Sequence, residues 1–293
     1  MTQPPVPGRR LLFGAHVPPS PYEGLGALRR LERDAGPLDI VHLFQPWAPS
    51  PVSDFHEEWL RPAHDSGHTI LLTWEPWHLD GGIHQAAYTA ARIAAGDHDP
   101  HIRAWARALA GLDFEIYLRP LHEMNGNWYP WAAGAPGARP ADVVAAWHHL
   151  REIFAAAGAD RVRWVWSPLC DDVPTTNRFE LSYPGTDAVD VLALDGYNWG
   201  ADVPEYGGWR DVGTLFADAY ARLTALGPQP MWFAEVGCSP VGGDKARWVA
   251  DLLTPGRFPR CAAVVWFDVD KEQDWRLASP PSAARAVARS LRP

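Results

Sequence analysis

The chain has little cysteine and no surplus of positive charge. Its three cysteines, Cys170, Cys238 and Cys261, are odd in number and widely spaced, so they define neither a disulfide framework nor a paired zinc motif. Lysine and arginine total 26 against 35 aspartate and glutamate, which leaves a formal net charge of −9. Binding to a phosphate backbone needs clustered basic residues, so we expect no nucleic-acid partner.

Long apolar runs are also missing. No run approaches the roughly 20 apolar residues that span a bilayer, and the first ten residues lack the apolar core of a signal peptide. We therefore expect no membrane attachment, and a cytoplasmic location unless the chain was trimmed from a longer, secreted protein. No feature indicates a cofactor or an obligatory protein partner. Residues 1–8 are rich in proline and predict a disordered tail, and residues 9–293 predict a single domain.

Eight short apolar runs alternate with helical patterns, which is typical of βα units around a parallel barrel. The chain length suits a single (β/α)₈ barrel, a fold of about 250 residues. The predicted strands are Leu11 to Val17, Ile40 to Trp47, Thr69 to Trp77, Phe114 to His122, Val162 to Ser167, Val189 to Tyr197, Pro230 to Val236 and Ala262 to Asp268. The predicted helices include Ile102 to Gly111, Ala141 to Ala157, Leu215 to Leu226 and Ala246 to Leu253.

Two connections are unusual. The segment from Ser167 to Val189 contains three internal prolines and has no room for a full helix, so it predicts a loop. The segment from Pro76 to Pro100 carries a helical stretch, and we expect it to arch over the barrel mouth. All strands of such a barrel end at that mouth, so polar residues that follow different strands become neighbours there.

The stretch Arg119 to Trp131 carries the strongest functional signal. It reads Arg-Pro-Leu-His-Glu-Met-Asn-Gly-Asn-Trp-Tyr-Pro-Trp and places one acid, Glu123, among hydrogen-bonding and aromatic side chains at the end of a predicted strand. Glycosidases need carboxyls for proton transfer and attack, polar groups for hydroxyls, and aromatic faces for the apolar side of a sugar ring. The stretch therefore predicts a site that cleaves carbohydrate.

Glu235 is the best second carboxyl, because it interrupts an apolar strand where a charge must be solvated or paired. Arg119 is its natural partner and would keep Glu235 ionised, while the less compensated Glu123 keeps a raised pKa. Two carboxyls in opposed environments suit a nucleophile and an acid. The alternative is a purely structural ion pair of Arg119 and Glu235 that closes the barrel.

Four segments resemble glycoside hydrolase family 26, the endo-β-mannanase family of retaining (β/α)₈ enzymes. They are Arg119 to Trp131, Tyr183 to Trp199, Phe233 to Gly237 and Trp266 to Trp275. The resemblance implies that Glu123 is the acid/base and Glu235 the nucleophile. A retaining mechanism predicts carboxyls roughly 5 to 5.5 Å apart.

The same resemblance implies roles for four further residues. His122 would orient the acid or bind sugar, Tyr197 would hydrogen-bond the nucleophile, and Trp128 and Trp266 would bound the subsite of the attacked sugar.

Four weaker candidates for substrate binding lie near other strand ends: Trp74, Asn198, Trp199 and His16. Trp74 could equally pack in the barrel wall, and a lone histidine such as His16 is more often structural. Asp195 and Asp268 could bind sugar or support Arg119 and nearby loops. We expect no catalytic metal, because neither His148-His149 nor His122-Glu123 has a matching ligand set.

The predicted substrate is a β-linked saccharide, with β-1,4-mannan or manno-oligosaccharides first. Mixed-linkage β-glucan and β-xylan remain open, as does transglycosylation. A noncatalytic carbohydrate-binding barrel is the rival from another class, and the presence of both Glu123 and Glu235 argues against it.

Overall fold

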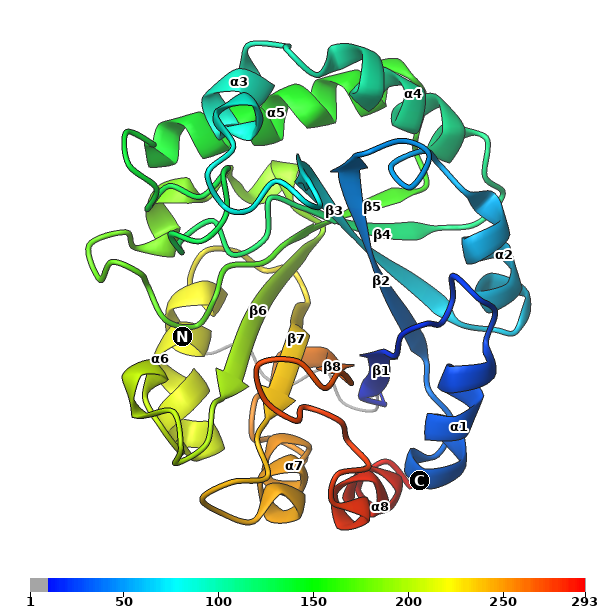
Figure 1. Cartoon of the computed structure of the whole chain (residues 1–293), viewed down its shortest axis with the longest axis vertical. Helices are drawn as coiled ribbons and strands as arrows, with labels where there is room; N and C mark the ends of the chain where they lie inside the picture. Colours follow the sequence, from blue (N-terminus) through cyan, green and yellow to red (C-terminus); the bar gives the residue numbers. More distant parts are fainter. Residues whose placement is uncertain (1–9, 293) are drawn as a thin grey trace.

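Eight parallel strands close into a barrel in the computed structural model, which describes residues 10–292 (Figure 1). Each strand pairs with the next, and the last pairs with the first. The strands are β1 Leu12–His16, β2 Ile40–Ala48, β3 Thr69–His78, β4 Ile116–Pro120, β5 Val162–Trp166, β6 Val191–Asn198, β7 Met231–Cys238 and β8 Cys261–Phe267. The predicted fold and all eight predicted strands are confirmed. The tail expected over residues 1–8 lies outside the described residues.

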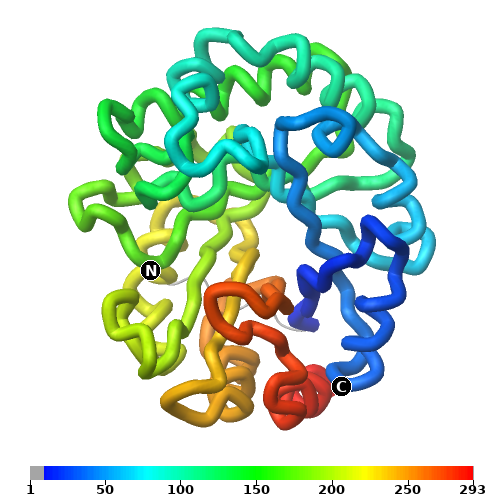
Figure 2. Tube along the Cα trace, viewed as in Figure 1, coloured from blue at the N-terminus to red at the C-terminus, as the bar shows by residue number. Residues whose placement is uncertain are grey.

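Helices surround the barrel, and the final helix packs against the first to complete the ring (Figure 2). The α-helices are α1 Gly26–Ala35, α2 Glu57–Asp65, α3 Ala90–Ala94, α4 Asp99–Ala110, α5 Pro140–Ala156, α6 Val212–Thr224, α7 Lys245–Leu252 and α8 Pro281–Ser290. Short 3₁₀ turns are η1 Ala86–Tyr88, η2 Phe179–Ser182, η3 Thr186–Ala188 and η4 Pro204–Tyr206. The four named helix predictions agree with α4, α5, α6 and α7 to within three residues at either end.

The two unusual connections differ in outcome. The connection after β5 holds only η2 and η3, as expected from its prolines. In the connection after β3, helix α3 packs against α5 in the outer ring (Figure 1), so this helix does not form part of the arch predicted over the mouth. Ala90 and Ile93 of α3 are buried in the core, so apolar burial draws this helix outward.

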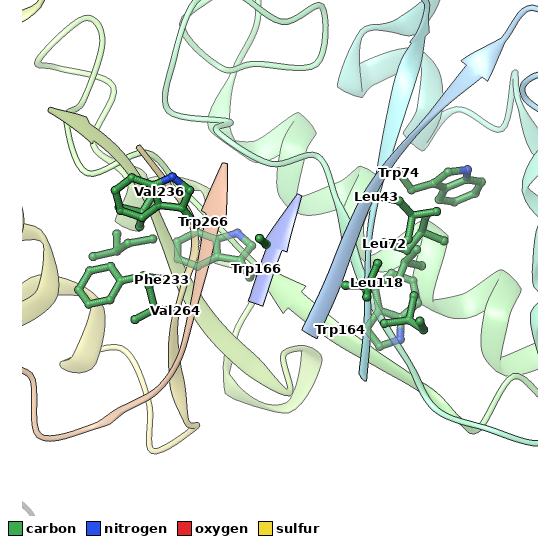
Figure 3. Close-up of a cluster of buried hydrophobic side chains, with 14 of the residues drawn as sticks. Leu43, Leu72, Trp74, Leu118, Trp164, Trp166, Phe233, Val236, Val264 and Trp266 are labelled. Atoms are coloured by element: carbon green, nitrogen blue, oxygen red, sulfur yellow. The ribbon is translucent and has the colours of Figure 1, made fainter. Parts of the chain in front are cut away.

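Side chains alternate between two cores along each strand. The outer core lies between strands and helices and contains Trp74, Trp166, Phe233, Val236 and Trp266 (Figure 3). The second core fills the base of the barrel interior with small and apolar side chains, among them Ile40, Leu71, Val165, Ala193, Trp232 and Val265. The interior positions above this base are therefore left for other residues.

Strand β7 breaks this alternation next to Glu235. Phe233 and Val236 pair with Val264 and Trp266 of β8, so three steps on β7 match two on β8. A bulge of this kind re-aims a side chain. Phe233 and Val236 both enter the outer core, and Glu235 between them turns toward the interior.

Candidate active site

Above the apolar base, the barrel interior becomes polar around Arg119 of β4. Its guanidinium is fully buried and donates to Thr73 Oγ1 from Nε at 2.7 Å. Nη1 donates to Asp195 Oδ2 at 2.6 Å, and Nη2 donates to Glu235 Oε2. Asp195 also accepts a 2.7 Å bond from Ser167 Oγ. The expected pairing of Arg119 with Glu235 is confirmed, and Asp195 supports Arg119 rather than facing a substrate.

Glu235 is held from two sides. Arg119 donates to Oε2 and the phenol of Tyr197 donates to Oε1, as predicted for Tyr197. The residue is only 7% exposed. Together these two donors fix the carboxylate in one orientation at the polar end of the barrel interior (the pocket).

Glu123 follows β4 with a left-handed backbone, φ +52°, two residues after Leu121 at φ +53°. Non-glycine residues rarely adopt this conformation, which costs about 1–3 kcal/mol per residue and concentrates at functional sites. The backbone N–H of Glu123 donates to Ser167 O at 2.8 Å. This contact anchors the turn that directs the carboxyl toward the pocket.

Trp128 covers the acid. Its indole N–H donates to Glu123 Oε2 at 2.7 Å. The ring lies over Gly126, where an added Cβ would come within 2.5 Å of it, so the absence of a side chain there lets the ring approach. Burial, and then the nearby Glu235 carboxylate, raise the pKa of Glu123 to about 8. Glu123 is therefore protonated at neutral pH, as an acid catalyst must be.

His122 is buried beside Tyr129. Its Nε2 lies 3.1 Å from Tyr129 Oη, and its backbone oxygen accepts from the Trp131 indole at 2.9 Å. Burial and the charge of Arg119 lower the pKa of His122 well below its usual range, so the ring is neutral. Its contacts thus hold the aromatic residues that follow the acid, and its role toward substrate remains a prediction.

His16 stands in the pocket wall among aromatic rings. Its ring centroid is 4.8 Å from that of Phe44 and 5.5 Å from that of Phe267. Its Nδ1 lies 3.0 Å from His42 O. Burial lowers the pKa of His16 to about 4, and Glu235 and Arg119 contribute opposing charge effects, which places His16 near the Arg119–Glu235 pair.

Two tryptophans predicted to bind substrate are in the outer core instead. Trp74 and Trp266 are both 0% exposed (Figure 3). Trp74 packs against Trp47 and Trp105. Trp266 donates its indole N–H to Trp275 O at 2.8 Å. Both predictions are wrong because these residues occupy outward positions on their strands.

Asn198 is a third correction, for the same reason of alternation. It follows the inward Tyr197 and is fully buried, with its Oδ1 accepting from the Arg210 backbone at 2.9 Å. Trp199 remains a candidate, since it is half-buried. It contacts Tyr197 and Tyr206 with ring centroids 6.1 and 4.6 Å away.

Several residues around Arg119 and Glu123 were not among the predicted site residues. They are inward neighbours of predicted ones: Thr73, Glu75, His42, Phe44, Tyr129 and Phe267. The signal that identifies most of them is the two-residue period along each strand. Because Leu71 points inward, Thr73 and Glu75 must point inward too, and Phe267 follows from Val265 in the same way.

Asp268 supports a loop, accepting from the Leu277 backbone N–H at 2.5 Å. Within residues 10–292, no group of three or more His, Cys, Asp or Glu side chains is arranged to hold a metal ion. In that same part of the chain, no helix combines the length and apolar character needed to cross a membrane.

Comparisons of the sequence and of the structure with known proteins point to the same family. The model of "Glycosyl hydrolase family 26" matches residues 79–234. Endoglucanase H of Acetivibrio thermocellus is 35% identical over 290 residues, which cover 96% of this chain and 30% of that protein. A mannan endo-1,4-beta-mannosidase of Bacillus subtilis strain 168 is 29% identical over 133 residues, 44% of this chain and 32% of that protein.

The chain thus spans about a third of the length of these curated relatives. Among solved structures, the Bacillus subtilis mannanase man26 has a TM-score of 0.69 at 19% identity, with 97% of this chain and 86% of that chain covered. GH26A from Muricauda sp. MAR_2010_75 has a TM-score of 0.66 at 18% identity, covering 94% and 88%. These structural likenesses agree with the barrel fold.

Proposed function

Because the chain belongs to glycosyl hydrolase family 26, we propose that it is a retaining endo-β-glycoside hydrolase with Glu123 as acid/base and Glu235 as nucleophile. The observation that carries the proposal is the difference between the two carboxyls. Glu123 is protonated at neutral pH because burial raises its pKa to about 8. Glu235 accepts hydrogen bonds from Arg119 and Tyr197, which orient a carboxylate for attack.

The reaction proceeds in two steps. In the first, a carboxylate oxygen of Glu235 bonds to the anomeric carbon while the glycosidic C–O bond breaks, and Glu123 transfers its proton to the departing oxygen. In the second, Glu123 removes a proton from water, the water oxygen bonds to the anomeric carbon, and Glu235 leaves. The anomeric configuration is retained, and Glu123 is protonated again for the next cycle.

β-1,4-Mannan and manno-oligosaccharides are the first candidate substrates. Their support is the set of curated relatives named mannan endo-1,4-beta-mannosidase. β-Glucan is the second candidate, and a specific observation favours it: the match to Endoglucanase H covers 96% of this chain, whereas the mannosidase matches cover 28 to 44%. Only the former match is long enough to include all the strands that line the pocket.

The test is hydrolysis of mannan, glucomannan, mixed-linkage β-glucan and xylan, with products sized by chromatography and their anomers followed by NMR. We expect internal cleavage with initial release of the β-anomer. Glu123→Gln and Glu235→Gln should each lose more than about 100-fold in kcat while still binding oligosaccharide. Initial release of the α-anomer would overturn the retaining mechanism, and full activity of both variants would overturn the residue assignment.

Two rival activities give different results in the same assay. Transglycosylation would produce oligosaccharides longer than the substrate when an acceptor sugar is added. A binding-only barrel would bind the oligosaccharides without producing any shorter product.

A further inference from the structure

Glu75 is a third carboxyl in the pocket that the two-carboxylate reaction does not use. It lies on β3 two residues beyond Thr73, whose hydroxyl accepts from Arg119. Because side chains on one face of a strand recur every two residues, Glu75 shares the inward face and stands one step nearer the mouth. It is 5% exposed.

No hydrogen bond from residues 10–292 satisfies this carboxyl. Its nearest basic neighbour is His122, whose Nε2 is 3.9 Å from Glu75 Oε1, beyond hydrogen-bonding distance. That ring is neutral, because burial lowers the pKa of His122, and its Nε2 is already 3.1 Å from Tyr129 Oη. Trp77 is the other nearby donor. Its indole N–H interacts with Glu75 and lowers the pKa of that carboxyl, but it is buried without a partner in hydrogen-bond geometry.

An unsatisfied buried polar group is costly, and the large majority of such groups in proteins have a partner. The Trp77 indole N–H is such a group, and the adjacent Glu75 carboxyl receives no hydrogen bond of ordinary geometry from the described residues. Burial, and then the charge of Glu235, raise the pKa of Glu75 to about 8. A protonated carboxyl can donate one hydrogen bond and accept others, which matches neighbouring hydroxyl groups on a sugar ring.

We propose that Glu75 is a substrate-positioning residue whose carboxyl group hydrogen-bonds ring hydroxyl groups of the saccharide bound in the pocket. This inference rests on the proposed glycosidase function. Glu75 reaches the sugar from β3, whereas Glu123 and Glu235 reach it from β4 and β7. The contact thus holds the ring from a side that neither catalytic carboxyl covers.

The charged and titratable groups that act on Glu75, or on which it acts, come from elements all around the pocket. They are Tyr22, Arg119, His122, Glu123, Tyr129, Glu235 and Lys271. Glu235 opposes ionisation of Glu75, and Arg119 and Lys271 favour it. The Glu75 carboxyl is therefore neutral at neutral pH, the form that can both donate a hydrogen bond to an uncharged sugar and accept one from it.

The test compares wild type with Glu75→Gln and Glu75→Ala. Binding of a manno- and a gluco-oligosaccharide is measured by calorimetry in a Glu235→Gln background, and kcat and KM are measured with Glu235 intact. We expect Glu75→Ala to raise both Kd and KM by about 10-fold, the effect of one or two lost hydrogen bonds, with a smaller change in kcat. Glu75→Gln keeps a donor and an acceptor, so its Kd should stay within about 3-fold of the Kd measured with Glu75 present.

The matched control is Glu32→Gln. Glu32 accepts from the Leu38 backbone at 3.2 Å, lies on α1 outside the barrel, and should change thermal stability alone. Unchanged Kd and KM in Glu75→Ala, with wild type active, would overturn the role of Glu75 and leave the proposed function intact. Wild type that cleaves no polysaccharide would instead overturn the proposed function, and the binding data would then report on Glu75 separately.

Discussion

The indole N–H of Trp128 donates a 2.7 Å hydrogen bond to Oε2 of Glu123. This bond favours the ionised form of Glu123 and opposes the larger effects of burial and of Glu235, which raise the pKa. The same side chain that covers the acid therefore limits how far its pKa can rise. The pH range of the enzyme should respond to this contact.

Trp128→Phe should move the alkaline limb of the kcat/KM profile to higher pH. Wild type loses activity as pH rises through the Glu123 pKa, about 8, because the proton donor is lost. Without the indole N–H, the Glu123 pKa rises further and the limb follows. We also expect kcat/KM at the optimum to fall about 2- to 10-fold. A limb that stays in place or moves to lower pH in Trp128→Phe would contradict the assignment of Glu123 as acid.

Glu123→Gln should raise thermal stability between about pH 5 and pH 8. The folded pKa of Glu123, about 8, lies above its ordinary value of 4.5, so the unfolded state binds fewer protons across this window. Stability of wild type therefore falls as pH rises, and glutamine removes that effect. We expect a gain of a few degrees in Tm at pH 7.5 that disappears near pH 4.5, measured by calorimetry. The exposed Glu115→Gln serves as control, and an equal gain at both pH values would refute the prediction.

Arg119→Lys should damage activity and stability together. A single ammonium cannot serve Asp195 and Glu235 as the two guanidinium nitrogens do, and breaking a buried pair costs about 3–5 kcal/mol. We expect kcat to fall at least about 100-fold, because the nucleophile loses its orientation.

The control for Arg119→Lys is Arg222→Lys. Arg222 donates to Asp172 and Glu180, both at 2.7 Å, outside the pocket. It should lower the urea midpoint without changing kcat. Wild-type kcat in a folded Arg119→Lys protein would show that the Arg119 cluster only closes the barrel.

Substitutions of Trp74 and Trp199 should have different effects, the first on the stability of the fold and the second on substrate binding. Trp74 is fully buried against Trp47 and Trp105, so Trp74→Phe should destabilise the fold by about 1–3 kcal/mol and leave KM unchanged. Trp199 is half-buried near Tyr197, so Trp199→Ala should raise KM several-fold with a smaller loss of stability. Steady-state kinetics and urea unfolding measure both. A raised KM for Trp74→Phe would instead show that Trp74 contributes to substrate binding.

The amino-acid sequence alone determined the order of strands and helices, the barrel, and the two carboxyls. Apolar runs about as long as a strand, separated by helical patterns, leave few other closed arrangements. Glu123 and Glu235 stand out because a carboxyl at the end of an apolar run needs a partner or a function. Arg119 follows from the same charge argument.

The tertiary structure alone decided which face each side chain occupies. Trp74 and Trp266 resemble sugar-binding residues in the sequence, yet they point outward, because inward and outward positions are set by pairing with other strands. The bulge in β7 turns Glu235 inward between two outward neighbours. The proximity of Glu75 on β3 to His122, which follows β4, exists only in the folded barrel. The pattern of a strand in the sequence shows that its side chains alternate between two faces. Closure of the barrel decides which of the two faces points into the interior, where the substrate would bind.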